Sequence, residues 1–124
     1  MRVVYQDTFQ VGEDTGDVDT MLDLQQGDMV EFSASGSIWA GVWFTGRNGP
    51  EGWNNIDHDR KFPLPGTHPY ALLGKLDGRY FYIGTGFKRV YQGPGSRLYL
   101  RVNDDTIANG NGAFQCSVVV WRHV

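Results

Sequence analysis

The sequence has a single cysteine, no long apolar run and no excess of basic residues. Cys116 has no second cysteine to pair with, which excludes an internal disulfide. Nowhere do about 18 apolar residues follow one another, so we expect no membrane insertion. The 124 residues carry a formal net charge of −3 and form no basic stripe, which argues against nucleic acid as a partner.

The first seven residues, MRVVYQD, lack the apolar run of a secretory signal. We therefore expect a protein that is cytoplasmic or released without a signal peptide. A chain of 124 residues is long enough for one hydrophobic core, which predicts one domain over residues 1–124.

No segment sustains the apolar spacing of an amphipathic helix. Alternating, β-branched and aromatic residues instead recur between glycine, asparagine and proline turns, which is typical of β-sheet. The predicted strands are Val3 to Gln6, Asp19 to Leu24, Met29 to Ser35, Ser37 to Trp43, Tyr70 to Leu76, Tyr80 to Gly84, Lys88 to Gln92, Arg97 to Val102 and Ala113 to Arg122.

About nine short strands with this punctuation predict an all-β fold, a β-sandwich of the jelly-roll kind. The last strand has the clearest sidedness, because every second residue from Phe114 to Val120 is apolar and would face the core. Cys116 shares that face, so we interpret it as a small buried hydrophobic residue and not as a reactive thiol.

Two connections carry the residues of functional interest. Between Phe44 and Tyr70 the chain is polar and broken by prolines, yet it contains Trp53 and Phe62, so it is either a functional loop or a surface flap held by its aromatics. Between two predicted strands, Asp104, Asp105, Asn109 and Asn111 give a loop rich in side-chain oxygens, as calcium requires. The same composition is also typical of an ordinary hairpin loop whose side chains satisfy their own backbone.

The order of motifs resembles the PA-IL-type bacterial galactophilic lectins, which are calcium-dependent. The resemblance covers about Gly27 to Val118, at low identity. Its motifs, none specific alone, are Asn103-Asp104 followed by Asn109, Gly112 and Phe114, and upstream Gly27-Asp28, Ser35-Gly36, Ala40-Gly41, Gly49-Pro50-Glu51-Gly52, Ala71-Leu72, Lys75 and Gly78.

The resemblance implies a galactose-binding-like β-sandwich in which one calcium ion bridges the protein and two sugar hydroxyls. The implied ligands are the Asp104 carboxylate, the Asn109 amide and the Ala40 carbonyl, with approximate replacements at Thr106, Ile107 and Asn111. The resemblance also implies a glycan as the partner and leaves a homo-oligomer open. The predicted sugar contacts are Asp104, Asp105, Asn109, Trp43, Trp53, His58 and Phe62.

The aromatic contacts rest on a departure from the family. The family's specificity loop has a histidine and a glutamine around a His-Pro pair, whereas this chain has Phe62-Pro63-Leu64-Pro65-Gly66 or, in an earlier alignment, Asp57-His58. Trp43, Trp53 and Phe62 would then supply an apolar platform for the sugar ring, or would simply belong to the core and the flap.

Two alternatives to a calcium-dependent lectin follow from the residues. Asp57-His58-Asp59 and Asp104-Asp105 suggest a glycoside hydrolase, but the sequence does not set two carboxylates opposite each other. His58, His68 and His123 are too dispersed to form a metal triad. We therefore expect no enzyme, and the other alternative is a calcium-free interaction module that uses exposed aromatics.

Overall fold

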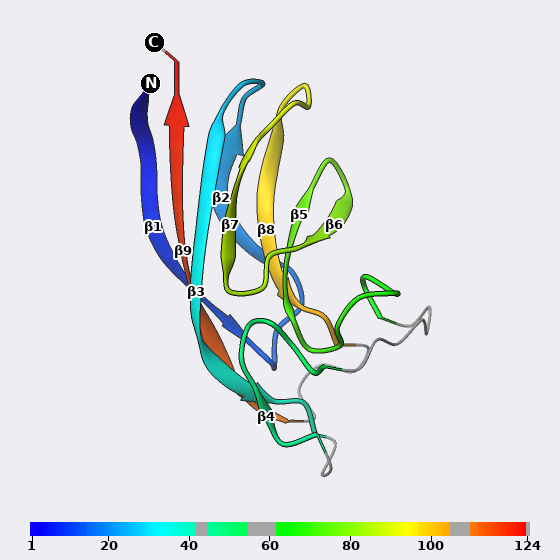
Figure 1. The fold of residues 1–124 in the computed structure, drawn as a ribbon. Coiled ribbons are helices and arrows are strands. Elements are labelled where there is room, and N and C mark those ends of the chain that lie inside the picture. Colours follow the sequence, from blue (N-terminus) through cyan, green and yellow to red (C-terminus); the bar gives the residue numbers. More distant parts are fainter. Residues whose placement is uncertain (42–44, 55–61, 105–109, 124) are drawn as a thin grey trace.

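The computed structural model describes residues 1–41, 45–54, 62–104 and 110–123. Within these ranges the chain forms nine β-strands arranged as two antiparallel sheets (Figure 1). No helix able to cross a membrane occurs in this part of the chain. The prediction of an all-β sandwich of about nine short strands is confirmed.

One sheet has five strands and the other has four. The first runs β1 (Arg2–Gly12), β9 (Asn111–Arg122), β3 (Met29–Trp39) and β4 (Arg47–Asn48), and β7 (Gly86–Val90) also pairs with β3. The second runs β2 (Val18–Leu24), β8 (Ser96–Val102), β5 (Leu72–Leu76) and β6 (Arg79–Tyr82).

The sandwich has two distinct ends, and the functional argument depends on this distinction. The N- and C-termini lie side by side at one of them, which we call the terminal end (Figure 1). At the other, which we call the loop end, β1, β3 and β8 finish and β9 begins.

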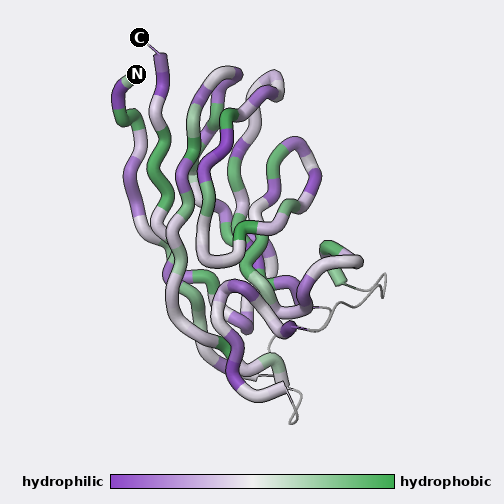
Figure 2. Tube along the Cα trace, viewed as in Figure 1, coloured by the Kyte–Doolittle hydropathy of each residue, from purple (hydrophilic) through white to green (hydrophobic). Residues whose placement is uncertain are grey.

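The core lies between the sheets and is built from alternating positions of the strands. In β9, Phe114, Cys116, Val118 and Val120 are all fully buried, whereas Gln115 between them is exposed. Figure 2 shows the corresponding alternation of hydrophobic and hydrophilic residues along the strands. Burying one large apolar side chain stabilises a fold by about 1.5–3 kcal/mol. The predicted sidedness of this strand is confirmed.

Cys116 is part of this core. It is a free thiol with no exposed surface, and burial raises its pKa to about 12. A thiol that stays protonated at neutral pH is a poor nucleophile. The interpretation of Cys116 as a small buried hydrophobic residue is confirmed.

The predicted break between Ser35 and Ser37 is wrong, because β3 is one continuous strand. Its pairing with β9 runs without interruption from Met29↔Trp121 to Trp39↔Asn111. Gly36 has a φ of 95°, and a Cβ at this position would lie 2.6 Å from the Ala113 carbonyl oxygen. The glycine thus marks a close approach between two strands, and not a turn.

β1 is much longer than the predicted Val3 to Gln6. It continues beside β9 as far as Gly12, which lies opposite Ala113. As the outermost strand of its sheet it leaves many of its side chains exposed, so its hydrophobic alternation is weak in the sequence. Because β1 extends to Gly12, it ends at the loop end, beside the first residues of β9.

Candidate functional site

Strand register brings several predicted site residues to the loop end. Trp39 at the end of β3 lies opposite Asn111 at the start of β9, and Ala40 follows directly with no exposed surface. Asp104 follows the end of β8 and is 1% exposed. The structure therefore places two predicted calcium ligands, Ala40 and Asp104, at the same end of the sandwich.

Gly110 forms a tight joint between the two sides of this end. A Cβ on Gly110 would overlap the Trp39 carbonyl oxygen and would lie 2.7 Å from the Gly41 backbone nitrogen. No side chain fits between these groups, so the backbone at Gly110 packs directly on the backbone that flanks Ala40.

Glu13 is a residue of this joint that the sequence analysis missed. Its side chain is completely buried, and its Oε2 accepts a hydrogen bond from the Gly110 N–H at 3.0 Å. Its own N–H donates to the Gly112 carbonyl at 3.1 Å. Glu13 follows β1 in a polar turn, where an acidic residue is ordinarily solvated, so nothing in the local pattern indicates burial.

Asn103, beside Asp104, fixes the approach of the chain to the site. Its amide nitrogen donates to the carbonyls of Leu64 and His68 at 3.2 and 3.1 Å, and its amide oxygen accepts from the Leu64 N–H at 3.0 Å. The backbone is equally engaged, because Tyr70 N–H donates to the Asn103 carbonyl at 2.6 Å. These hydrogen bonds connect the segment after Phe62 to the residue that follows the end of β8. They thereby fix the backbone position of Asn103, which precedes Asp104.

The aromatic residues of the long connection form a cluster around Tyr70. Trp53 stacks on Tyr70 with ring centroids 6.3 Å apart, and Phe62 meets the same ring edge-on at 6.2 Å. Phe62 is only 8% exposed and belongs to the core, so it offers a ligand little surface, whereas Trp53 is partly exposed. The contact of either residue with a ligand stays a prediction.

The side chain of Asn111, a predicted metal ligand, is hydrogen-bonded to an arginine. Its amide oxygen accepts a hydrogen bond from Arg47 Nη1 at 2.8 Å, and the residue is exposed. Arg47 also donates to the Ser37 hydroxyl and carbonyl, both at 3.0 Å. The role of Asn111 in metal binding stays a prediction that would require its amide to turn away from Arg47.

The remaining site predictions fall outside the described residues. They are Trp43, His58, Asp105, Thr106, Ile107 and Asn109, together with Asp57 and Asp59 of the glycosidase alternative.

The donors that are described suit a hard cation. They are the buried carboxylate of Asp104 and the buried backbone at Ala40, both of them oxygen donors, and the buried Glu13 carboxylate lies at the same end. Calcium takes oxygen ligands, whereas zinc favours histidine and cysteine. In the described part of the chain no three His, Cys, Asp or Glu side chains are grouped to hold a metal. A complete calcium site would thus draw on the predicted ligands within residues 105–109.

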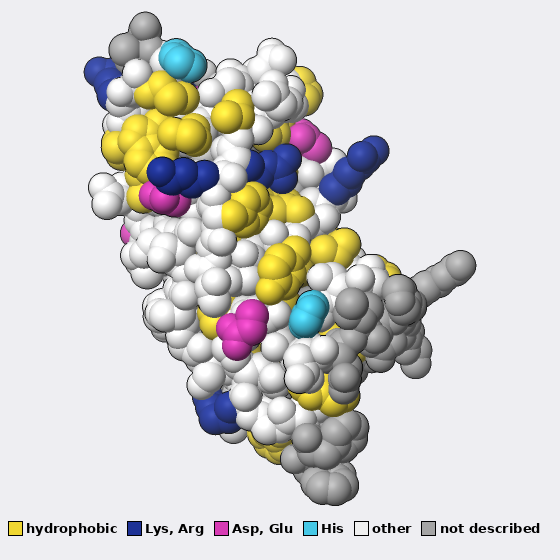
Figure 3. All heavy atoms as spheres, viewed as in Figure 1, with side chains coloured by type: hydrophobic (Ala, Val, Ile, Leu, Met, Phe, Trp, Pro, Cys, Tyr) yellow, Lys and Arg dark blue, Asp and Glu magenta, His cyan; other side chains and the backbone are white. Residues whose placement is uncertain are grey.

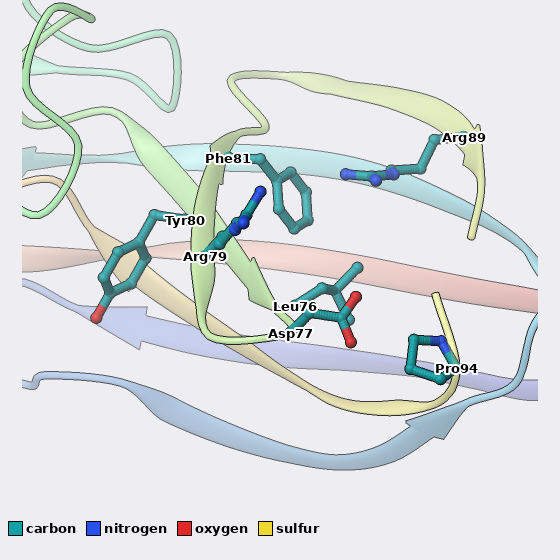
Figure 4. Close-up of a pocket in the computed structure, with 7 residues that line it drawn as sticks. All are labelled: Leu76, Asp77, Arg79, Tyr80, Phe81, Arg89 and Pro94. Carbon is teal, nitrogen blue, oxygen red and sulfur yellow. The ribbon is translucent and has the colours of Figure 1, made fainter. Parts of the chain in front are cut away.

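Two hollows on the surface of the described residues lie far apart. A groove at the loop end passes beside Glu13 and is lined by Gln10, Gly12, Asp14, Gly110, Asn111, Gly112 and Ala113. The other lies at the tip of the β5–β6 hairpin, with Arg89 over the Phe81 ring at 4.9 Å (Figure 4). Because Val102 pairs with Leu72, at the start of β5, the pocket at Leu76 is remote from Asp104.

Comparison with known proteins gives matches among solved structures. No family model matches the chain, and no curated protein sequence does. Among solved structures, the N-terminal domain of EclA, a PllA-like lectin, superposes with a TM-score of 0.71 over 96% of this chain and 98% of that domain, at 18% identity. This chain has the fold of that lectin domain. The resemblance to lectins predicted from the sequence is thereby confirmed at the level of the fold.

Proposed function

We propose that this chain is a non-catalytic carbohydrate-binding domain that holds its sugar through a calcium ion at the loop end. The observation that carries the proposal is the burial of the Asp104 carboxylate to 1% exposure, at the same end of a lectin-like fold as the buried Ala40. The similarity of the fold to a lectin domain supports the proposal that the chain binds sugar. The oxygen donors at the loop end support the proposal that the bound ion is calcium.

Each residue of the proposed site has a separate task. Asp104 supplies a negative charge and Ala40 a backbone carbonyl, while Thr106, Ile107, Asn109 and Asn111 would complete the oxygen ligands. A bound calcium ion would supply positive charge and open coordination positions for sugar hydroxyls. The partly exposed indole of Trp53 offers a flat apolar surface for the C–H groups of the sugar ring. Trp43, His58 and Asp105 stay predicted sugar contacts.

The expected ligand is a galactoside-type or related glycan, and the expected calcium affinity is modest. Asp104 would be the only carboxylate in this ligand set, with the Asp105 carboxylate next to it in the sequence, and sites of low charge bind calcium in roughly the micromolar to millimolar range. Such a domain would act where calcium is plentiful. Several copies would raise the avidity of weak single sites.

Asp104→Asn is the substitution that tests this proposal, because it keeps the shape of the side chain and removes its charge. We expect it to weaken calcium binding by more than about 100-fold, since even outer residues of metal sites contribute about 10–100-fold. Glycan binding should be lost with it. Calorimetry gives the calcium affinity, and a glycan array with and without EDTA gives the sugar binding.

Asp7→Asn is the matched control, since Asp7 is exposed on β1 and its side chain accepts, among the described residues, only the neighbouring Thr8 N–H. This variant should bind calcium and glycan as the wild type does. Glycan binding that persists in EDTA would contradict the calcium-mediated proposal. Turnover of chromogenic glycosides that disappears in Asp104→Asn would instead support a hydrolase.

A calcium-free interaction module is the second candidate, and one observation favours it. An apolar row crosses four strands of the larger sheet near the terminal end, in the order Val3, Trp121, Met29 and Val90. Val3 and Val90 are 46% and 45% exposed, and Figure 3 shows hydrophobic side chains gathered at this end. If calcium and EDTA leave melting unchanged, this second candidate is the better account.

A further inference from the structure

Glu13 is a buried acid whose hydrogen-bonding capacity is only partly used by the residues that the structure describes. Its side chain has no exposed surface, and its Oε2 accepts the Gly110 N–H at 3.0 Å. Its Oε1 is also buried and accepts no hydrogen bond from any residue that the structure describes. No lysine, arginine or histidine in the described ranges forms a salt bridge with it.

Such an arrangement is unfavourable in the protein alone. A carboxylate loses its hydration on burial, and the loss is offset only by hydrogen bonds or by a nearby positive charge. Among the described residues, one backbone N–H supplies part of that compensation. A cation bound near Glu13 would add to the compensation that the described residues supply.

The position of Glu13 connects this charge to the proposed calcium site. Gly110, its hydrogen-bond partner, ends the connection in which Asp104, Thr106, Ile107 and Asn109 are predicted ligands. The same glycine packs on the backbone of Trp39 and Gly41, on either side of Ala40. Glu13 thus holds the joint between the two stretches of chain that would supply the ligands.

We propose that Glu13 is a positioning residue of the calcium site. Its Oε2 anchors Gly110 and so fixes the end of the ligand-bearing connection, and its negative charge favours a cation at the loop end. This inference rests on the proposed function. It implies that Glu13 opposes the stability of the metal-free domain and supports that of the calcium-bound domain.

Glu13→Gln separates these effects, because glutamine keeps an oxygen for the Gly110 N–H and removes the charge. We expect calcium affinity, measured by calorimetry, to fall about 10–100-fold, as for outer residues of metal sites. The melting temperature in EDTA should stay equal or rise, and the increase on adding calcium should shrink. Glu51→Gln, the same change at an exposed loop residue, should alter none of these values.

If Glu13 had a purely structural role, Glu13→Gln would lower the melting temperature equally in EDTA and in calcium and would leave the calcium affinity unchanged. That result would overturn the inference. Glu13→Asp is the second variant, used also if the glutamine variant does not fold. It retains the charge on a shorter side chain, so its calcium affinity should lie between the wild type and Glu13→Gln. Wild-type protein that binds no calcium would refute the proposed function itself, whereas normal binding by both Glu13 variants would refute only this inference.

Discussion

Asp28 and Glu13 are buried carboxylates at opposite ends of β9, and they differ in the hydrogen bonds and counter-charges that compensate their negative charge. Asp28 at the terminal end is 1% exposed and accepts hydrogen bonds from Arg122 Nε at 2.9 Å, from Arg122 Nη2 at 2.8 Å and from the Gln25 N–H at 2.8 Å. Glu13 at the loop end accepts one hydrogen bond, from Gly110, among the described residues.

The difference indicates that Asp28 stabilises the fold through its ion pair with Arg122, whereas the charge of Glu13 is available to a bound cation. Both oxygens of Asp28 are engaged, and the arginine that pairs with them closes the end of β9 against the turn before β3. Burial alone would raise the pKa of Asp28, but the hydrogen bonds from Arg122 and Gln25 outweigh it and lower the pKa. Glu13 has no such counter-charge among the described residues, so its negative charge would favour a cation bound nearby.

Asp28→Asn should give the largest effect on stability. Breaking a buried ion pair costs about 3–5 kcal/mol, and because Arg122 remains partly exposed we expect about 2–3 kcal/mol. Urea unfolding measures this loss, and Glu31→Gln on the exposed pair with Lys88 is the control, with about 0–1 kcal/mol expected. The calcium-induced rise in melting temperature should persist in Asp28→Asn. Its disappearance would break the proposed division between the two ends.

Gly110→Ala should have the next largest effect. The added methyl group would overlap the Trp39 carbonyl oxygen, so the joint with Ala40 and the hydrogen bond to Glu13 must shift. We expect a loss of about 1–3 kcal/mol, as for overpacked sites, and weaker calcium binding. Gly16→Ala is the matched control, because nothing lies within 4 Å of a Cβ there. Equal stability and equal calcium affinity of the two variants would contradict the tight joint.

The pH dependence of Asp28 should give the smallest and most selective effect. A carboxylate whose pKa is lower in the folded state than its unfolded value of about 3.9 stabilises the fold above that value and loses this contribution as pH falls through the folded pKa. The stability difference between wild type and Asp28→Asn should therefore be constant near neutral pH and shrink below about pH 4. Urea unfolding of both proteins across this pH range measures the stability difference. A difference that grows on acidification would contradict a lowered pKa for Asp28.

The fold could be predicted because its signals are local. Alternation from Phe114 to Val120 indicates which face of β9 is buried, and the turn residues mark where most strands end. The errors arose where local signals conflict with pairing. Gly36 resembles a turn residue but lies within β3, and the polar half of β1 forms a strand because β9 lies beside it.

The candidate site could be predicted only in part. Asp104 and Ala40 lie at the same end of the sandwich, and their binding of a metal stays a prediction. The buried position of Phe62 follows from its packing on Tyr70. Glu13 could not be found, because its burial depends on residues about 100 positions later in the chain, Gly110 and Gly112. No periodicity around Glu13 records a contact of that kind.

The most direct test of a calcium site at the loop end is the melting temperature of the metal-stripped wild-type protein as calcium is added. A ligand that binds only the folded state stabilises it by about 2.7 kcal/mol at 100 times its dissociation constant. We predict a melting temperature that rises with calcium concentration and returns to its starting value in EDTA. An unchanged melting temperature from EDTA to millimolar calcium would contradict the proposal.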